Sequence, residues 1–257
     1  MSFDTGHING FIRRKTGDFE TIVISNPNKN LARAAGILYL VMIVCGMAAQ
    51  LIRGSLIVPG NGVVTTGNIV ASESLFRVAF ISDLFMATGF LLFAWALYVL
   101  LKPVNKNIAL LFVLLATASV AILCLNLLNQ FAILILVNDA GYLAAFGAVH
   151  LNALVMLFAD LHYYGYYIAQ ISFGLWLAPL GYLVIKSGFL PRILGILLII
   201  ATFGHLFGFL AAFLLPGYES FGDLPAFLEI PFGLWLLVKG VQGQQPVKNP
   251  NQQAAIS

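Results

Sequence analysis

The stretch SESLFRVAFISDLFMATGFLLFAWALYVLL, residues 72–101, passes from a polar start into a long apolar run. After Asp83, residues 84–101 include no charged side chain. About 20 apolar residues in a helix cross the hydrocarbon core of a bilayer. The stretch therefore predicts a membrane-spanning helix over residues 78–101. It also raises the question of why Arg77 and Asp83 lie at the start of that helix.

The composition of the whole chain extends this prediction. Hydrophobic residues make up 60% of the 257 residues, charged residues make up 9%, and mean hydropathy is +0.94. A soluble domain carries about 25% charged residues, so much of this surface must face lipid. Stretches long enough to span are expected to be helices, because a helix satisfies its own backbone polar groups in lipid. The predicted spans are 34–52, 78–101, 108–137, 161–185, 193–215 and 225–241.

The sequence thus predicts an all-α polytopic membrane protein with six transmembrane helices in one membrane domain, residues 31–241. Residues 1–30 are expected to form a loosely ordered tail and residues 242–257 a disordered one, because both are polar and poor in apolar residues. Residues 138–164 are mostly apolar, and joined to the fourth span they would make a helix of about 45 residues and about 68 Å. That length exceeds one crossing, so we expect a separate interfacial or re-entrant helix near 143–158, followed by a turn.

The basic residues predict the orientation. Eleven of the thirteen fall in or beside the two tails or in the links 102–107 and 186–192, and only Arg53 and Arg77 fall on the other side. Basic residues are enriched on the cytoplasmic side of a membrane. We therefore expect both termini in the cytoplasm. The net charge of +3 is explained by this distribution and requires no nucleic-acid partner.

Several motifs resemble a known family. They are ARAAGILYL, NIVASESLFRVAFISDL, LYVLLKPVNKNIALL, DLHYYGYYIAQISFGLWLAPLGYLVIKSGFLPRILGILL and FLLPGY, spread over about residues 31–240. The chain resembles the bacterial integral-membrane family catalogued as domain of unknown function 4386. The resemblance implies a multi-pass protein of the bacterial inner membrane. It implies no activity, cofactor or catalytic residue.

Polar side chains inside the predicted spans are the candidates for a binding site, because such residues are costly in lipid and mark function by default. The candidates are Asp83, Asn126, Asn129, Gln130, His162, Tyr166, Gln170, His205 and Glu229. All lie in the outer halves of their spans, which predicts a cavity that opens outward or toward the outer leaflet. The competing interpretation is that these side chains form interhelical hydrogen bonds that hold the bundle together.

The question about Arg77 and Asp83 has an answer in helical geometry. Arg77 can keep its stem in lipid and its head in water, and Glu73, four residues earlier, suits it as a partner. Six residues is a poor spacing for a salt bridge between Arg77 and Asp83. Asp83 is therefore expected to face the bundle, where its partner would be His162, His205 or an amide of the third span.

A weak internal repeat suggests a more specific arrangement. FISDLF, IAQISF and FLEIPF each place a hydrogen-bonding side chain after an apolar start and shortly before a phenylalanine. If the chain consists of three hairpin repeats about an axis along the membrane normal, equivalent side chains face one centre. Asp83, Gln170 and Glu229 would then share one cavity.

Three functions remain open at this stage. The first is a binding or transport-like protein whose outward polar cavity holds a small amphiphile or lipid. The second is an intramembrane metal-dependent hydrolase that uses Asp83, His162, His205 and Glu229, and the third is a membrane scaffold or regulatory subunit. The sequence has no zinc-type histidine spacing, phosphate loop or dinucleotide fingerprint. No metal or cofactor is therefore predicted, and the expected partners are membrane lipid and a small amphiphilic ligand.

Overall fold

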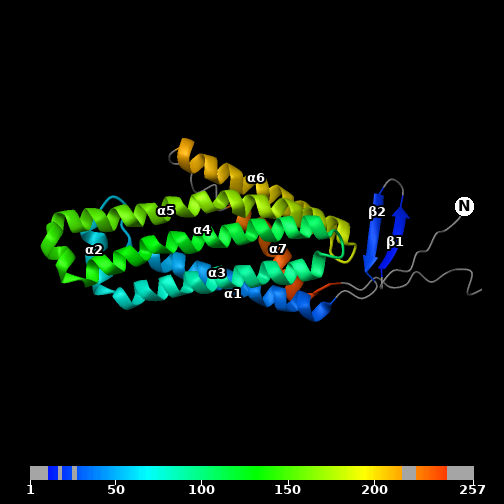
Figure 1. Cartoon of the computed structure of the whole chain (residues 1–257), viewed down its shortest axis with the longest axis horizontal. Coiled ribbons are helices and arrows are strands. Elements are labelled where there is room, and N and C mark those ends of the chain that lie inside the picture. Colours follow the sequence, from blue (N-terminus) through cyan, green and yellow to red (C-terminus); the bar gives the residue numbers. More distant parts are fainter. Residues whose placement is uncertain (1–10, 17–18, 25–27, 216–223, 242–257) are drawn as a thin grey trace, which may run out of the picture.

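The computed structural model describes residues 11–16, 19–24, 28–215 and 224–241, and over these ranges it is an elongated bundle of helices lying side by side (Figure 1). Seven helices are described in this part of the chain. They are α1 (Lys29–Leu56), α2 (Gly62–Ala71), α3 (Glu73–Leu101), α4 (Lys106–Asn138), α5 (Ala140–Ser187), α6 (Arg192–Leu214) and α7 (Leu224–Val238). We call the end of the bundle that holds α2 the α2 end, and the opposite end the basic end.

Side-chain caps explain where several helices begin. Asn28 Oδ1 accepts from the backbone N–H of Leu31 at 3.0 Å, and Asn61 Oδ1 accepts from that of Val64 at 3.1 Å. Asn105 caps α4 in the same way. The first N–H groups of a helix have no partner within it, so a side-chain oxygen at this position stabilises the start.

Five helices in the described part of the chain, namely α1, α3, α4, α5 and α6, are long and apolar enough to cross a membrane. They contain five of the six predicted spans, so the chain is a multi-pass membrane protein. The sixth predicted span, 225–241, corresponds to α7, which has 15 residues. At 1.5 Å per residue α7 is about 23 Å long, shorter than the hydrocarbon core of a typical bilayer.

The expected turn between a separate interfacial helix and the fourth span is wrong. The chain is helical from Ala140 to Ser187, and its one non-helical residue is Gly147, at φ 70° and ψ 161°. A positive φ costs glycine little, and the residues after Gly147 include no other glycine before Gly165. The bend therefore falls at Gly147, and α5 continues through the position where we expected a turn. The link before α3 also contains a helix that we did not predict, α2.

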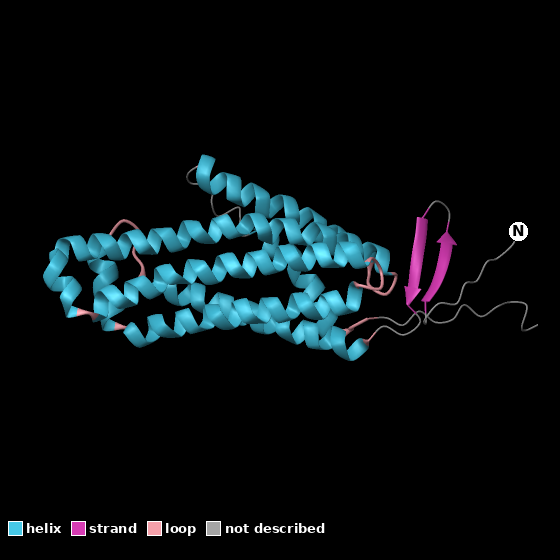
Figure 2. Cartoon of the chain, viewed as in Figure 1, coloured by secondary structure: helices cyan, strands magenta, loops and turns pink. Residues whose placement is uncertain are grey.

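The N-terminal segment contains two strands in place of an irregular tail. β1 (Phe11–Thr16) and β2 (Phe19–Ile24) form an antiparallel pair in which Phe11 faces Ile24 and Thr16 faces Phe19. Figure 2 shows this hairpin beyond the basic end of the bundle. The predicted tail at 242–257 lies outside the described residues.

The buried apolar residues form two cores. The larger core extends toward the basic end and is built around an aromatic cluster, in which Trp176 contacts Phe90, Phe93 and Phe112. The smaller core lies at the α2 end. Its members include Leu56, Ile69, Phe76, Ile133, Leu151 and Val155.

A layer of buried polar residues separates the two cores. In α3 the chain passes from Phe76 of the smaller core through Asp83 to Ala87 of the larger. In α5 it passes from Ala159 through His162 and Gln170 to Trp176. The same order holds in α4, where Asn126 and Gln130 lie between the apolar positions. The fold therefore brings polar side chains from different helices to one level of the bundle.

Small residues bring helices close together near the basic end. A Cβ on Gly36 of α1 would lie 2.6 Å from Cα of Leu237 of α7. A Cβ on Gly181 of α5 would lie 2.6 Å from the carbonyl oxygen of Gly195 of α6, and the reverse contact would be 2.5 Å. Close backbone packing of this kind holds helices together where the hydrophobic effect between them is weak.

Candidate functional site

Four helices contribute to one buried network at the level of the polar layer. Arg53 of α1 forms an ion pair with Oδ2 of Asp83 of α3. Gln130 Nε2 of α4 donates to the same carboxylate oxygen at 2.8 Å and lies 3.0 Å from Nε2 of His162 of α5. The side chains of Arg53 and Asp83 are 13% and 6% exposed, so the ion pair is largely shielded from solvent. Gln50 accepts from the other guanidinium nitrogen at 3.1 Å.

The contacts of His162 determine its tautomer. Gln130 Nε2 can only donate, so Nε2 of His162 must accept and carries no proton. The proton is then on Nδ1, which lies 3.4 Å from the carbonyl oxygen of Asn126. Asn126 Nδ2 donates in turn to the carbonyl oxygen of His162 at 2.9 Å. The imidazole is therefore neutral and held from both sides.

One polar atom of the Gln130 amide, its oxygen, is not hydrogen-bonded by the network. Gln130 is 1% exposed, and its Oε1 has no hydrogen-bond partner among the described residues. Turning the amide around would place Oε1 against the carboxylate of Asp83, where two acceptors would repel. The orientation that serves Asp83 and His162 thus leaves a buried acceptor free for a water molecule or a ligand donor.

A second cluster joins α5, α6 and α7. Nδ1 of His205 contacts Oε1 of Gln170, and Nε2 of His205 lies 2.7 Å from Oε1 of Glu229. Gln170 and His205 are 2% and 7% exposed. Phe173 stacks near the imidazole, with ring centroids 6.5 Å apart.

These clusters account for most of the predicted site residues. Asp83, Gln130, His162 and Asn126 meet in the first cluster, and Asn129 joins it through hydrogen bonds from its Nδ2 to the backbone and side-chain oxygens of Asn126. Gln170, His205 and Glu229 meet in the second. Tyr166 is 38% exposed and contacts the rings of Tyr167 and Phe173. The expected partnership of Arg77 with Glu73 is confirmed at 2.6 Å.

Two expectations from the sequence are corrected. Asp83 does not share a centre with Gln170 and Glu229, because its carboxylate pairs with Arg53 and Gln130 instead. The four residues of the metal-hydrolase interpretation are divided between the clusters. No group of three His, Cys, Asp or Glu side chains that could hold a metal occurs among the described residues.

Sequence reasoning missed Arg53 as a member of the site. The available signal was its position: twenty residues separate Arg33 from Arg53 on one helix, about 30 Å at 1.5 Å per residue. Lys102, the residue directly after α3, comes nineteen positions after Asp83. Arg53 and Asp83 therefore lie at similar distances from the basic end, where an arginine and an aspartate can pair across two helices.

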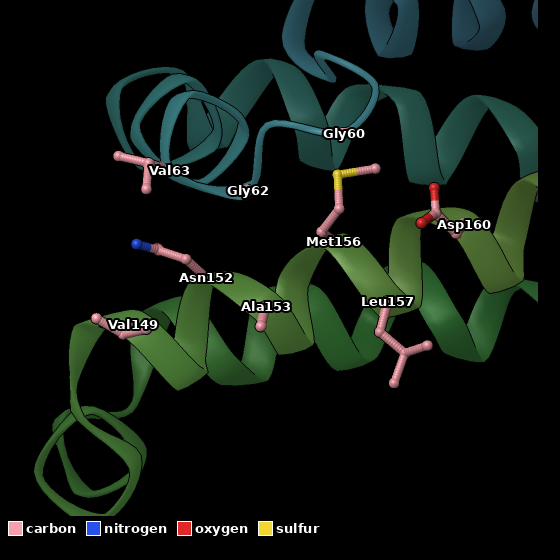
Figure 3. A pocket seen from close by; sticks show the side chains of 9 residues that line it. All are labelled: Gly60, Gly62, Val63, Val149, Asn152, Ala153, Met156, Leu157 and Asp160. Carbon is pink, nitrogen blue, oxygen red and sulfur yellow. The ribbon is translucent and has the colours of Figure 1, made fainter.

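A cavity of about 460 Å³ that is largely open to the surface lies at the α2 end, between α5 and the segment that begins α2. It is lined by Gly60, Gly62, Val63, Val149, Asn152, Ala153, Met156, Leu157 and Asp160. Figure 3 shows these side chains along one stretch of α5 and around the 60–63 segment. None of the predicted site residues lines this cavity, so the polar residues and the hollow surface are separate features.

Asp160 is the charged side chain of the cavity lining. It is exposed, and its carboxylate has no hydrogen-bond or ion-pair partner among the residues that the structure describes. Asn152, Met156 and Asp160 follow at four-residue intervals and share one face of α5. Asp160 lies two residues from His162, so the cavity adjoins the polar layer.

Comparisons with known proteins confirm the resemblance seen in the motifs. The family described as domain of unknown function 4386 matches residues 34–240. An uncharacterized protein from Archaeoglobus fulgidus is 35% identical over 158 residues, which are 61% of this chain and 80% of that protein. No solved structure matches the chain. The family match covers nearly all of the helical bundle, and the chain therefore belongs to the family of domain of unknown function 4386.

Proposed function

We propose that this chain is a binding or transport-like membrane protein that takes up a small amphiphile or lipid at its α2 end. The observation that carries the proposal is the cavity between α2 and α5, with its apolar lining and one carboxylate that has no partner among the described residues. Its volume falls within the range of roughly 300–1,000 Å³ that is typical of small-molecule sites. Polar groups in such sites are few and fix the orientation of the ligand.

The charge distribution supports an outward position for this end. The basic end holds Lys29, Arg33, Lys102, Lys106, Lys186, Arg192 and Lys239. Such an excess is typical of the cytoplasmic side. With the basic end inside, the cavity opens toward the outside of the cell or the outer leaflet, and all six predicted spans cross with α7 returning the chain to the cytoplasm.

The helix lengths support a position of the cavity beyond the hydrocarbon core. Twenty-four residues separate His162 from Lys186 on α5, about 36 Å along the helix axis. A bilayer core about 30 Å thick that begins near Lys186 ends close to His162. Tyr163 and Tyr164, which are 45% and 43% exposed, suit the headgroup level there, where tyrosine is enriched.

Beyond this level the α2 end still presents apolar side chains. Val63 is 68% exposed, Val149 is 77% exposed and Leu157 is 51% exposed, and all three line the cavity. Apolar surface outside the hydrocarbon is unfavourable unless something covers it, and such patches mark ligand or membrane contacts. A hydrocarbon chain in the cavity would cover these side chains.

Asp160 supports a preference for the head of the amphiphile. A carboxylate can only accept hydrogen bonds, and it attracts a positive charge. The head that suits it is an ammonium or another group with several N–H or O–H donors. Asn152, eight residues before Asp160 on the same face of α5, offers an amide to the same cavity. The proposed ligand class is therefore an amphiphile with a cationic or donor-rich head.

Mass spectrometry of what co-purifies with the full chain tests the proposed function. We expect a single class of amphiphile in the parent, and we expect Ala153→Trp, which fills the cavity, to lose it. Ala144→Trp is the matched control, because Ala144 is exposed on α5 and does not line the cavity. Retention of the same molecule by Ala153→Trp would contradict the assignment. An empty cavity together with a stable protein partner would favour the scaffold function instead.

A further inference from the structure

The second polar cluster, Gln170, His205 and Glu229, carries an inference that is independent of the amphiphile cavity. The three side chains come from α5, α6 and α7, and both Gln170 and Glu229 contact His205. Gln170 and His205 are buried, and the side chain of Glu229 is 15% exposed. We propose that this cluster is a site that binds one proton inside the membrane.

The hydrogen-bond chemistry of the cluster determines how many protons it holds. Oε1 of Gln170 can only accept, so Nδ1 of His205 must carry a proton. Nε2 of His205 and Oε1 of Glu229 lie 2.7 Å apart, which is a hydrogen-bond distance and requires a second proton between them. That proton is either on the imidazole, facing a carboxylate, or on the carboxyl group, facing a neutral imidazole. In both cases the pair as a whole is neutral.

The surroundings favour this neutral state over the deprotonated one. Without the shared proton, the ring would have one N–H for two acceptors, and the cluster would carry a full negative charge. A charge without a partner is costly to bury in an apolar environment. Tyr39 of α1 is a titratable side chain close to Glu229; it is buried, and a phenol cannot supply a positive charge.

The packing around the histidine shows that the site is built into the fold. A Cβ on Gly174 of α5 would lie 3.1 Å from Cβ of His205 and 3.0 Å from the carbonyl oxygen of Thr202. Glycine at this position lets α6 approach α5 closely enough for His205 to reach Gln170. Phe173 covers the imidazole on one side. These contacts fix the ring so that its two nitrogen atoms face α5 and α7.

The proton has a structural consequence for the last two helices. The His205–Glu229 hydrogen bond joins α6 to α7, and Gln170 joins α6 to α5. Loss of the proton leaves one ring proton for two acceptors, so either the contact with Gln170 of α5 or the contact with Glu229 of α7 loses its hydrogen bond. Proton occupancy therefore favours the closed arrangement of these helices, and proton release weakens the contact of α6 with α5 or with α7.

Nuclear magnetic resonance of the full chain in lipid bilayers, labelled with ¹⁵N-histidine and ¹³C-glutamate, tests the proposal. The signals of His205 and Glu229 are assigned by their loss in His205→Gln and Glu229→Gln. At neutral pH we expect Nδ1 of His205 to be protonated and one further proton to reside on Nε2 or on the Glu229 carboxyl group. As the pH is raised, both residues should change together at one midpoint, because they share one proton.

Two controls separate this site from general effects. Glu73→Gln removes an acid from an exposed ion pair and should leave the His205 signals unchanged. Glu229→Gln should leave His205 with a proton on Nδ1 alone. Once the variants have assigned the two signals, the parent spectrum alone decides the matter. A bare Nδ1, an ionised Glu229 beside a neutral His205 at neutral pH, or two separate midpoints would overturn the proposal.

Discussion

The ion pair between Arg53 and Asp83 joins two helices within a largely apolar bundle. Both side chains are buried, and Gln130 supplies an additional hydrogen bond to the carboxylate. Replacing a buried ion pair by apolar residues can be neutral, but removing one partner leaves an uncompensated charge. The pair is therefore more sensitive to single substitutions than to a matched double substitution.

We predict that Asp83→Leu destabilises the protein by about 3–5 kcal/mol, because it leaves the Arg53 guanidinium buried without its counterion. Asp83→Asn should cost less, since the amide oxygen can still accept from Arg53. Unfolding of the purified protein in mixed detergent micelles measures both values.

The double substitution Arg53→Met and Asp83→Leu should recover much of the stability lost in Asp83→Leu. Glu73→Gln is the matched control, because it breaks the exposed pair with Arg77. Such exposed pairs contribute about 0–1 kcal/mol. Equal stability of Asp83→Leu and the parent would show that Asp83 does not pair inside the bundle.

Individual residues also show what could be predicted from the sequence. The inward orientation of Asp83 follows from its position six residues after Arg77, and its contact with an amide of the third span was predicted. The contact with Arg53 was not, because Arg53 reads as an exposed residue at the end of a span. Which helices pack side by side depends on tertiary contacts, and helical periodicity does not specify them.

At the scale of helices, contact between α1 and α7 depends on Gly36. This glycine lets the backbone of α7 come so close that any side chain on α1 would collide with Leu237. The same α7 carries Glu229 toward His205. The α1–α7 contact therefore helps to position the proton-binding cluster.

Gly36→Ala should destabilise the bundle by about 1–3 kcal/mol, the range typical of overpacking. Gly54→Ala is a matched control on the same helix, because a Cβ there has nothing within 4 Å. Alanine is the better helix former, so the control should be neutral or slightly stabilising. The same unfolding assay compares the two, and an equal effect of both substitutions would contradict the close α1–α7 contact.

A second prediction at this scale concerns the bend in α5. Gly147 has φ 70° and ψ 161°, a backbone conformation that is essentially restricted to glycine and costs a residue with a Cβ roughly 1–3 kcal/mol. Gly147→Ala should therefore lower stability by about that amount even though no atom lies within 4 Å of the new methyl group. If Gly147→Ala behaves like Gly54→Ala, the bend at Gly147 is wrong.

The bend also explains why the sequence misplaced a helix boundary. The length argument predicted that residues 138–185 are too long for one crossing. It assumed that the excess must lie in the membrane interface, and so placed a turn before residue 161. The structure continues the helix beyond the polar layer instead, and only the backbone conformation of Gly147 reveals where it changes direction.

At the scale of the whole molecule, composition and charge predicted the class of protein well. Apolar stretches of sufficient length mark the long helices, because lipid requires each of them to satisfy its own backbone. The division of the polar side chains into two clusters could not be predicted. Asp83, Gln170 and Glu229 lie in similar short motifs, FISDLF, IAQISF and FLEIPF. Only the packing of α5 between its neighbours assigns the three side chains to different partners.

The proposed topology gives a prediction for reporter fusions. A reporter after residue 104 should be cytoplasmic, one after residue 220 should be outside, and one after residue 241 should be cytoplasmic again. The last fusion tests whether α7 crosses despite its 15 residues. An outside signal at 104 would reverse the orientation, and an outside signal at 241 would leave five spans.

The central claim is that the cavity at the α2 end binds the head and chain of an amphiphile through Asp160 and its apolar lining. Native mass spectrometry of the purified full chain, offered dodecylammonium or dodecanol at equal concentration, tests it most directly. The two probes share one chain length and differ in the charge of the head. The parent and the control Glu73→Gln should retain the ammonium in preference to the alcohol, and Asp160→Asn should lose this preference. Equal retention of both probes by the parent, or a preference that survives in Asp160→Asn, would contradict the claim.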